Sequence, residues 1–143
     1  MSDIFSENAI KNIPLINKHI VEKRPEEHGI DDPDILPRIF ARVNGHQNSV
    51  NRRERIINMA TDIMAGIIFE QPFKNGNKAT AMVLSQHFLK EHGFVIPLMV
   101  SDNELVELLE SVSPLYLSED KYDIAFTKVR NFLSKNIVEI KRD

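Results

Sequence analysis

The amino-acid sequence predicts an all-α protein. Apolar residues recur at three- and four-residue steps in several separate segments, which is the periodicity of amphipathic helices. Glycine, proline, asparagine and aspartate separate these segments, and the only β structure that the pattern allows is a short hairpin in the loops. The chain has 143 residues, of which 42% are hydrophobic and 27% charged. This length supports one hydrophobic core, so we assign residues 1–143 to a single domain.

The first part of the chain is predicted to form three helices. Residues 4–13 form a short helix, and Pro14 is expected in the first turn of the next one, where its missing N–H has no cost. For the third helix, Asp32 is a suitable N-cap and Pro33 a suitable first residue. Gly45 is expected to end this third helix.

The longest helix is predicted from about residue 50 to residue 69. Its apolar residues are dense and recur on one face, which indicates a helix at the centre of the fold. The next helix is predicted to begin near Asn77 or Lys78 and to run to His92, with Gly93 as its stop signal.

The last part of the chain is predicted to contain an extended or irregular segment over residues 94–100, followed by two further helices. Ser101 and Glu104 have the spacing of a capping box, which predicts a helix start. A final helix is predicted from about Glu119.

Composition and charge argue against several classes of function. The chain has no cysteine, which excludes disulfides and thiolate metal sites and fits a reducing compartment. No segment has the roughly 20 apolar residues of a membrane span, and the first residues lack the features of a signal peptide, so we expect a cytoplasmic protein without membrane contact. The net charge of −3 argues against nucleic-acid binding. For the basic cluster at residues 52–55, a solvated helix face is favoured over a phosphate contact.

The most informative stretch is residues 71–80, Gln-Pro-Phe-Lys-Asn-Gly-Asn-Lys-Ala-Thr, between two predicted helices. Its Gly-Asn-Lys run lies where a helix begins. The first backbone N–H groups of a helix have no intrahelical partner and favour a nearby anion. The alternative interpretation is a simple interhelical turn, in which Gly76 takes a positive φ and Asn77 is the N-cap.

This stretch resembles the signature loop of the Fic/Doc family, which in its Doc (death-on-curing) branch has the pattern His-x-Phe-x-Asp/Glu-Gly-Asn-Lys-Arg-Thr. The frame of the pattern is kept by Phe73, Gly76, Asn77, Lys78 and Thr80. The positions of the family's catalytic histidine, acid and arginine are taken by Gln71, Asn75 and Ala79. The resemblance extends over roughly residues 15–112, including the glycine-and-aspartate turn at residues 28–36 and the helices on both sides of the loop.

The resemblance implies the compact multi-helix Fic/Doc (Fido) fold, with the signature loop between two core helices. It also implies a relationship to enzymes that transfer a phosphoryl or nucleotidyl group from a nucleoside triphosphate to a protein hydroxyl, as in protein phosphorylation or AMPylation. Doc-type toxins act on a translation factor and are paired with an antitoxin, so both kinds of partner are implied. Contacts with a nucleotide or its phosphates are assigned by resemblance to Phe73, Gly76, Asn77, Lys78 and Thr80.

The three departures from the pattern predict impaired or altered catalysis. Gln71 has no usable basic site and cannot act as a general base. Asn75, at the family's metal-binding position, keeps a carbonyl oxygen but no charge, so we expect ATP or another nucleoside triphosphate to bind with little help from Mg²⁺. Ala79 lacks the guanidinium with which the family's arginine would bind phosphate oxygens.

Two other functions fit the same residues. The first is a non-catalytic module that binds a nucleotide or a protein. The second is altered chemistry in which Gln71 positions an attacking water or hydroxyl.

Another side chain could in principle supply the missing base. Among the five histidines, His46 is the strongest candidate, because the resemblance places its polar loop near the cleft. Glu70, next to Gln71, is expected to face solvent.

Overall fold

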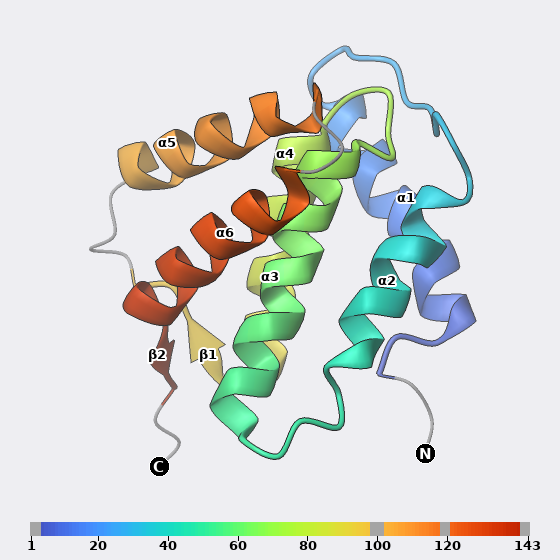
Figure 1. The fold of residues 1–143 in the computed structure, drawn as a ribbon. Helices are drawn as coiled ribbons and strands as arrows, with labels where there is room; N and C mark the ends of the chain where they lie inside the picture. The colour runs from blue at the N-terminus through green and yellow to red at the C-terminus, as the bar shows by residue number, and fades with distance from the viewer. Residues whose placement is uncertain (1–3, 98–101, 118–120, 141–143) are drawn as a thin grey trace.

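The computed structural model describes residues 4–97, 102–117 and 121–140, and within them the all-α prediction is confirmed (Figure 1). The α-helices are α1 (Glu7–Glu22), α2 (Ile35–Gly45), α3 (Arg52–Glu70), α4 (Asn77–Glu91), α5 (Asp102–Val112) and α6 (Tyr122–Asn136). A 3-10 helix, η1 (Ser113–Leu117), follows α5, and two short strands are β1 (Phe94–Val95) and β2 (Val138–Glu139). None of the helices in these ranges combines the length and the apolar character needed to cross a membrane.

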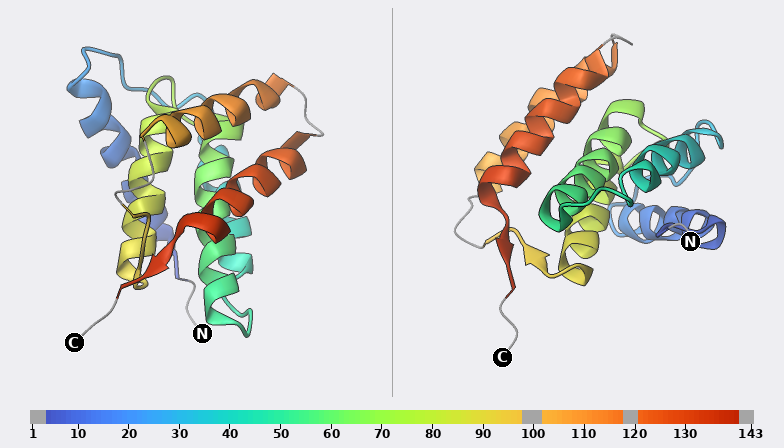
Figure 2. Two further views of the ribbon diagram at one scale, coloured as in Figure 1. Left: turned by 90° about the vertical axis from the view of Figure 1, so that its left-hand side faces the viewer. Right: turned by 60° about the horizontal axis from the view of Figure 1, so that its bottom comes forward.

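Helix α3 is the centre of the molecule, as its dense apolar pattern predicts. Every residue from Met59 to Ile68 is buried, so the helix is covered on all sides along this stretch. Helices α2, α4 and α6 make the largest contacts with it. Figure 2 shows α3 between α2 and α6. Helix α1 packs against α2 and α4, while α5 and η1 lie along α6 and the end of α3.

Helix α1 is one continuous helix, so the prediction of two helices separated at Pro14 is wrong. Ser6 is the N-cap, and its side-chain oxygen accepts a hydrogen bond from the backbone N–H of Ala9 at 3.2 Å. Pro14 removes one backbone hydrogen bond in the interior of the helix. The buried face formed by Ile13, Asn17 and Val21 continues past it at four-residue steps, and this packing keeps the helix whole.

Helix α2 begins two residues later than the sequence predicts. Asp34, not Asp32, is the N-cap residue. The side chain of Asp32 instead accepts a hydrogen bond from the backbone N–H of Asp34 at 2.9 Å, which makes a turn just before the helix. The predicted end at Gly45 is confirmed.

The strands form a two-stranded antiparallel sheet in which Phe94 pairs with Glu139 and Val95 with Val138. The sequence predicts at most a local hairpin, and this expectation is wrong because the partners are more than forty residues apart. Helix α6 begins at Tyr122. The predicted helix start signals at Ser101 and Glu119 lie outside the described residues.

Candidate functional site

Two left-handed residues shape the turn between α3 and α4. Gln71 ends α3 with φ 50° and ψ 63°, and its N–H donates to the carbonyl of Ile67 at 3.0 Å. This C-terminal position is usually glycine, because a side chain is strained there. Gly76 has φ 77°, as the sequence predicts, and a Cβ added to it would lie 2.8 Å from Cγ1 of Val21 in α1. Gly76 therefore lets the turn lie directly against α1.

Asn77 closes the turn with its side chain. Its Oδ1 accepts from the N–H of Phe73 at 3.0 Å, and its Nδ2 donates to the carbonyl of the same residue at 2.8 Å. Phe73 is 1% exposed and belongs to the core. The N-cap position is Gly76, so the prediction of Asn77 as N-cap is wrong by one residue. The Asn77 side chain thus holds the turn, and its backbone N–H, in the first turn of α4, is a donor for a ligand.

A buried asparagine in α1 supports the turn from the other side. Asn17 is fully buried, and its Nδ2 donates to the carbonyl of Asn75 at 2.8 Å and to the hydroxyl of Thr80 at 3.0 Å. Its Oδ1 lies 2.9 Å from Nδ1 of His28, which must be the donor in this pair because the amide oxygen only accepts. Asn17 was not predicted from the sequence as part of the site. The one signal for it is a polar residue on the buried stripe between Ile13 and Val21.

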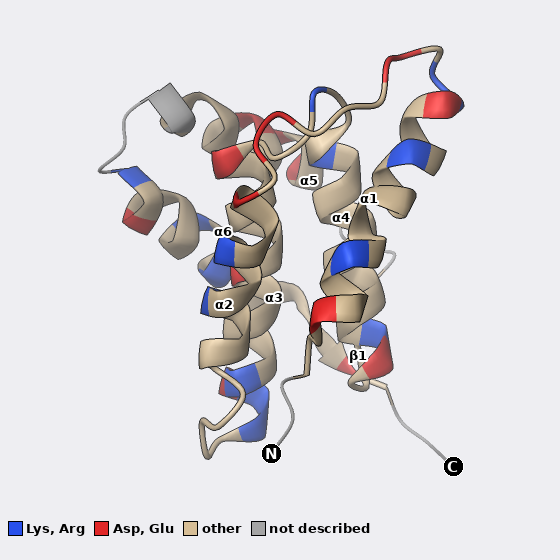
Figure 3. Ribbon diagram, turned by 90° about the vertical axis from the view of Figure 1, so that its right-hand side faces the viewer, with Lys and Arg blue, Asp and Glu red and all other residues tan. Residues whose placement is uncertain are grey.

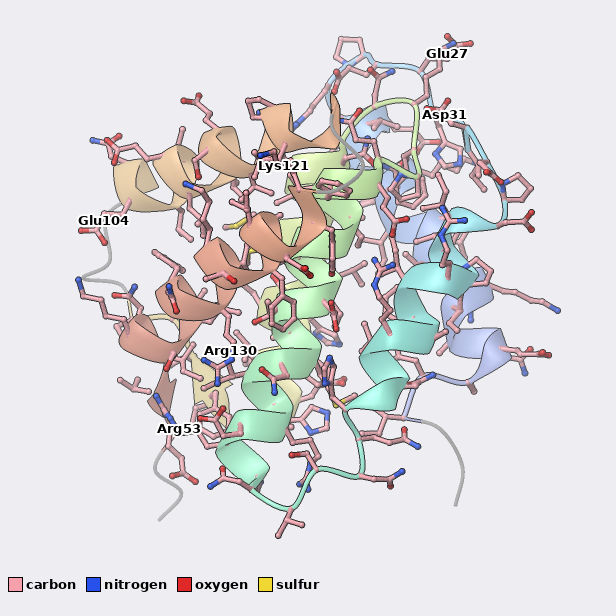
Figure 4. All side chains as sticks on the ribbon, in the orientation of Figure 1. Glu27, Asp31, Arg53, Glu104, Lys121 and Arg130 are labelled. Carbon is pink, nitrogen blue, oxygen red and sulfur yellow. The ribbon has the colours of Figure 1, made fainter. Side chains whose placement is uncertain are left out.

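The connection between α1 and α2, residues 23–34, runs alongside the turn and is bonded to it. The N–H of Lys74 donates to the carbonyl of Gly29 at 2.9 Å, and the N–H of Asp31 donates to the carbonyl of Pro72 at 3.0 Å. Figure 4 shows Glu27 and Asp31 on this connection, and Figure 3 shows its acidic residues in red. Nδ2 of Asn75 donates to the carbonyl of Glu27 at 2.9 Å.

Lys74 also forms an ion pair with this connection. Its Nζ lies 2.6 Å from Oε2 of Glu27, and this hydrogen bond raises the pKa of Lys74 and lowers the pKa of Glu27. The positive charge of Lys74 is thus already matched within the protein.

A polar cleft of about 290 Å³, which we call the loop cleft, lies at the start of α4. Its lining consists of Arg24, Glu26, Ile68, Gln71, Lys74, Asn75, Gly76, Asn77, Lys78, Ala79 and Ser113. The structure therefore brings together Gln71, Asn75 and the residues from Gly76 to Ala79. The side chains of Phe73 and Thr80 do not line the cleft; they are buried behind it. Arg24, Glu26 and Ser113 were missed, because nothing in their sequence surroundings relates them to residues 71–80.

Hydrogen-bond donors and positive charge dominate this cleft. The N–H groups of Asn77, Lys78 and Ala79 are in the first turn of α4, where a helix provides no acceptor and its dipole attracts anions. In the described residues, no carboxylate lies within 4.0 Å of the cationic groups of Arg24 or Lys78. The geometry is suited to binding an anion.

The cleft is poorly suited to a metal ion or to proton transfer. Glu26 is the one carboxylate among its lining residues, and the amide of Asn75 is tied to the connection. Across the described part of the chain, no three or more of His, Cys, Asp and Glu are grouped so as to hold a metal. The residues present thus do not fit a Mg²⁺ site, and no cleft-lining side chain except the Glu26 carboxylate can act as a base near neutral pH.

His46 lies elsewhere, so the expectation that it is near the cleft is wrong. Its Nε2 is 2.6 Å from Oδ2 of Asp62, which is 3% exposed in the middle of α3 and also accepts a hydrogen bond from the hydroxyl of Tyr122. Asp62 is nine residues before Gln71 in α3, or about 13 Å along the helix axis. Because α2 ends beside the middle of α3, its last turn points away from the 71–80 turn.

Glu70 is also not solvated as expected. Its side chain is 15% exposed, and its carboxylate accepts hydrogen bonds from Arg42 at 2.6 Å and from Arg38 at 3.2 Å. Burial is the largest single influence on the pKa of Arg42 and lowers it, but the hydrogen bond to Glu70 and the nearby charges of Tyr122, Glu70 and Asp62 together outweigh burial, so the pKa is raised. The Arg42 guanidinium also lies 4.5 Å above the ring of Tyr122. We call the group of Arg42, His46, Asp62, Glu70 and Tyr122 the Asp62 cluster.

The basic residues at the start of α3 join neighbouring segments, so they are more than a solvated face. Arg52 donates to the carbonyl of His92, and Arg53 donates to the carbonyl of Ser134 at 3.0 Å. Figure 4 shows Arg53 and Arg130 in this region, where Arg130 pairs with Glu54. The long arginine side chains reach carbonyl groups at the ends of other helices, which spacing along the sequence does not reveal.

A larger groove of about 540 Å³ lies between α1 and α4 and shares Arg24 with the loop cleft. Its lining is mainly carbon, from residues such as Leu15, Ile20 and Val83. The loop cleft is the more polar of the two and has the first-turn N–H groups of α4 beside it, so it is the better candidate for a polar ligand.

Comparisons of the chain with protein-family models, with curated proteins and with solved structures gave no match. The likeness to the Fic/Doc family is therefore a resemblance in sequence, based on the 71–80 segment, its flanking helices and the turn at residues 28–36.

Proposed function

We propose that the loop cleft binds the phosphates of a nucleoside triphosphate such as ATP, in a protein of the Fido fold related to Doc-type transferases. One observation carries this proposal. Gln71 and residues 75–79 line one polar cleft, together with the first-turn N–H groups of α4 and two cations, Arg24 and Lys78, that have no ion-pair partner among the described residues.

The size of the cleft limits what it holds. A cavity of about 290 Å³ is at the lower end of the range for small-molecule sites, and its polar lining suits phosphate groups better than a base or a sugar. We therefore expect the triphosphate to occupy the cleft and the nucleoside to extend beyond it. We expect little dependence on Mg²⁺, because Glu26 is the one carboxylate in the lining.

Group transfer to a protein hydroxyl is expected to be impaired. Gln71 lines the cleft, and a carboxamide can orient a hydroxyl or a water but cannot take up the proton of either. Gln71→His alone is expected to restore little transfer, because Asn75 and Ala79 still lack the acid and the arginine. Robust transfer by this single variant, measured with labelled ATP and a candidate target, would contradict the view that all three changes limit catalysis. A target such as a translation factor and an antitoxin remain predictions from the resemblance.

The second candidate function is a non-catalytic module that binds a nucleotide without transferring any part of it. It is favoured because the frame of the motif is kept while its chemical positions are replaced by Gln71, Asn75 and Ala79. Within the frame, Asn77 and Thr80 hold the turn, and Phe73 is in the core. Such a frame preserves the shape of the cleft whether or not chemistry follows. Binding without any transferred label would favour this candidate.

Calorimetric titration with ATP, with and without Mg²⁺, tests the shared part of both candidates. Lys78→Gln is expected to weaken binding by about ten-fold, the usual effect of losing one charged hydrogen bond. Lys90→Gln is the matched control, because Lys90 is exposed in the last turn of the same helix. No binding by the unmodified protein in either condition would overturn the proposal and leave the 71–80 segment as a structural turn.

A further inference from the structure

We propose that Arg24 is the phosphate-binding arginine of the loop cleft and takes the place of the guanidinium that is absent at Ala79. The inference rests on the proposed function, since it assigns a residue to the same phosphate site. It comes from the spatial arrangement of two segments that are separated by more than fifty residues in the chain.

The contact between Gly76 and α1 fixes where Arg24 lies. Only a glycine fits at position 76, because a Cβ there would be 2.8 Å from Cγ1 of Val21. This close approach places the last turn of α1 beside the first turn of α4. The chain then turns tightly, with the N–H of Arg24 donating to the carbonyl of Val21 at 3.0 Å and that of Glu26 donating to the same carbonyl at 3.1 Å. Arg24 thus enters the lining of the cleft from the end of α1.

The three cations of the cleft are in different electrostatic situations. Lys74 is paired with Glu27 at 2.6 Å. Arg24 and Lys78 have no carboxylate within 4.0 Å in the described part of the chain, although Glu26 lines the same cleft. An arriving phosphate therefore displaces no ion pair at Arg24, whereas it would have to compete with Glu27 for Lys74.

The chemistry of the guanidinium complements that of the other donors. Lys78 offers a compact charge, and the first turn of α4 offers backbone N–H groups that point along the helix axis. A guanidinium adds a planar pair of N–H donors that can bind two phosphate oxygens at once. The methyl side chain of Ala79 in the same lining leaves room for a guanidinium that comes from α1.

The test is calorimetric titration of the 143-residue chain with ATP, using three variants. Arg24→Gln removes the positive charge and the planar pair of N–H donors, and we expect the Kd for ATP to rise about ten-fold or more. Arg24→Lys keeps the charge but not the planar pair of donors, and we expect a Kd between those of the unmodified protein and Arg24→Gln. Lys23→Gln is the matched control: it removes the same charge from the adjacent residue, which lines the apolar groove and not the loop cleft. We expect its Kd to stay within about two-fold of the original.

The outcomes separate this inference from the proposed function. If the unmodified protein binds ATP and Arg24→Gln binds equally well, the role of Arg24 is overturned while the nucleotide site stands. Equal losses in Arg24→Gln and Lys23→Gln would also overturn it, because they would show a general charge effect. If the unmodified protein does not bind ATP, the proposed function fails and the inference fails with it. Circular dichroism and the thermal midpoint check that each variant is folded, which we expect because Arg24 is exposed.

Discussion

The Asp62 cluster and the loop cleft both lie along α3, and both are rich in polar side chains, but their donors and acceptors are used differently. In the Asp62 cluster, acidic and basic side chains of the protein are paired with one another around the buried carboxylate of Asp62. In the loop cleft, neutral amides hold the backbone in shape, while backbone N–H groups and two cations have no partner among the described residues.

This difference indicates where a ligand can act. The Asp62 cluster has more ionisable groups than the cleft, but its carboxylates are already bonded to its own side chains. Among the described residues, the one fully buried side-chain atom without a hydrogen bond is Nε of Arg42, 4.0 Å from Oδ1 of Asp62. A ligand would have to break these bonds to enter. The unpaired donors around the loop cleft therefore make it a better candidate for a ligand than the Asp62 cluster.

Asp62→Ala is expected to have the largest effect on stability. It removes the charged acceptor of the hydrogen bonds from His46 and Tyr122, and at about 1.5–3 kcal/mol for each bond to a charged group we expect a loss of about 3–5 kcal/mol. Urea denaturation measures this loss of stability, and Asp123→Ala, in the exposed first turn of α6, is the control. ATP binding by the remaining folded protein is expected to be unchanged. A large loss of affinity with intact folding would mean that the two regions are coupled.

Asn17→Ala is expected to destabilise the protein by about 2–4 kcal/mol, because it leaves the carbonyl of Asn75 and the buried hydroxyl of Thr80 without their donor. Unlike Asp62→Ala, it should also weaken ATP binding, since the turn at the cleft loses its support. Asn12→Ala, at an exposed position of the same helix, is the control for denaturation and titration. Unchanged affinity in a destabilised Asn17→Ala protein would show that the turn keeps its shape without the amide.

Gln71→Gly is expected to stabilise the protein by up to about 1 kcal/mol, because Gln71 has φ 50° and glycine adopts this conformation without strain. Gln86→Gly is the matched control. It places glycine inside α4 at an exposed position and should destabilise by about 1 kcal/mol. Denaturation curves of both variants show whether each change raises or lowers the free energy of unfolding. A destabilised Gln71→Gly protein would mean that the Gln71 side chain contributes more contacts than its backbone strain costs.

Ionisation of the Tyr122 hydroxyl is expected to have the smallest effect on stability near neutral pH, and its titration shows how far the Asp62 cluster is closed to solvent. Burial and the nearby carboxylate of Asp62 raise its pKa above that of a free tyrosine. Its contribution to stability is therefore complete below the unfolded pKa of about 10 and is lost as the pH rises above that value. The chain has two tyrosines, so the absorbance of Tyr122→Phe subtracted from that of the unmodified protein gives the titration of Tyr122 alone. If Tyr122 ionises near pH 10 while the protein is still folded, its hydroxyl is exposed to solvent and the Asp62 cluster is not closed.

Local signals made most of the fold predictable. The helix at residues 52–70 has a strong apolar pattern, and the glycines at positions 45, 76 and 93 mark boundaries that the structure confirms. Pro14 was misjudged because packing of α1 outweighs one lost hydrogen bond. The β1–β2 pair was missed because its strands are short and far apart in the chain.

The candidate site was predictable only where it is contiguous. Residues 71–79 supply most of the cleft, and they follow one another in the chain, so their spacing alone relates them. Arg24 and Asn17 come from α1 and its end, so only the folded arrangement relates them to the turn. His46 was placed near the cleft by resemblance alone, whereas in the structure it is bonded to Asp62.

The pairing of β1 with β2 has a consequence for the order in which the molecule is completed. It encloses α5, η1 and α6 in one long chain loop, which is closed further by the bond from the N–H of Ile140 to the carbonyl of Gly93 at 2.7 Å. Loop-closure entropy does not by itself make this contact later than the bonds of α1 to the turn, because those bonds close a longer loop and the entropy cost grows slowly with length. During synthesis, however, α1, the turn and the start of α4 leave the ribosome before Ser113 does, so they can assemble first and the Ser113 wall of the cleft joins last. A nascent chain would have the donors of the loop cleft in place before the cavity is complete.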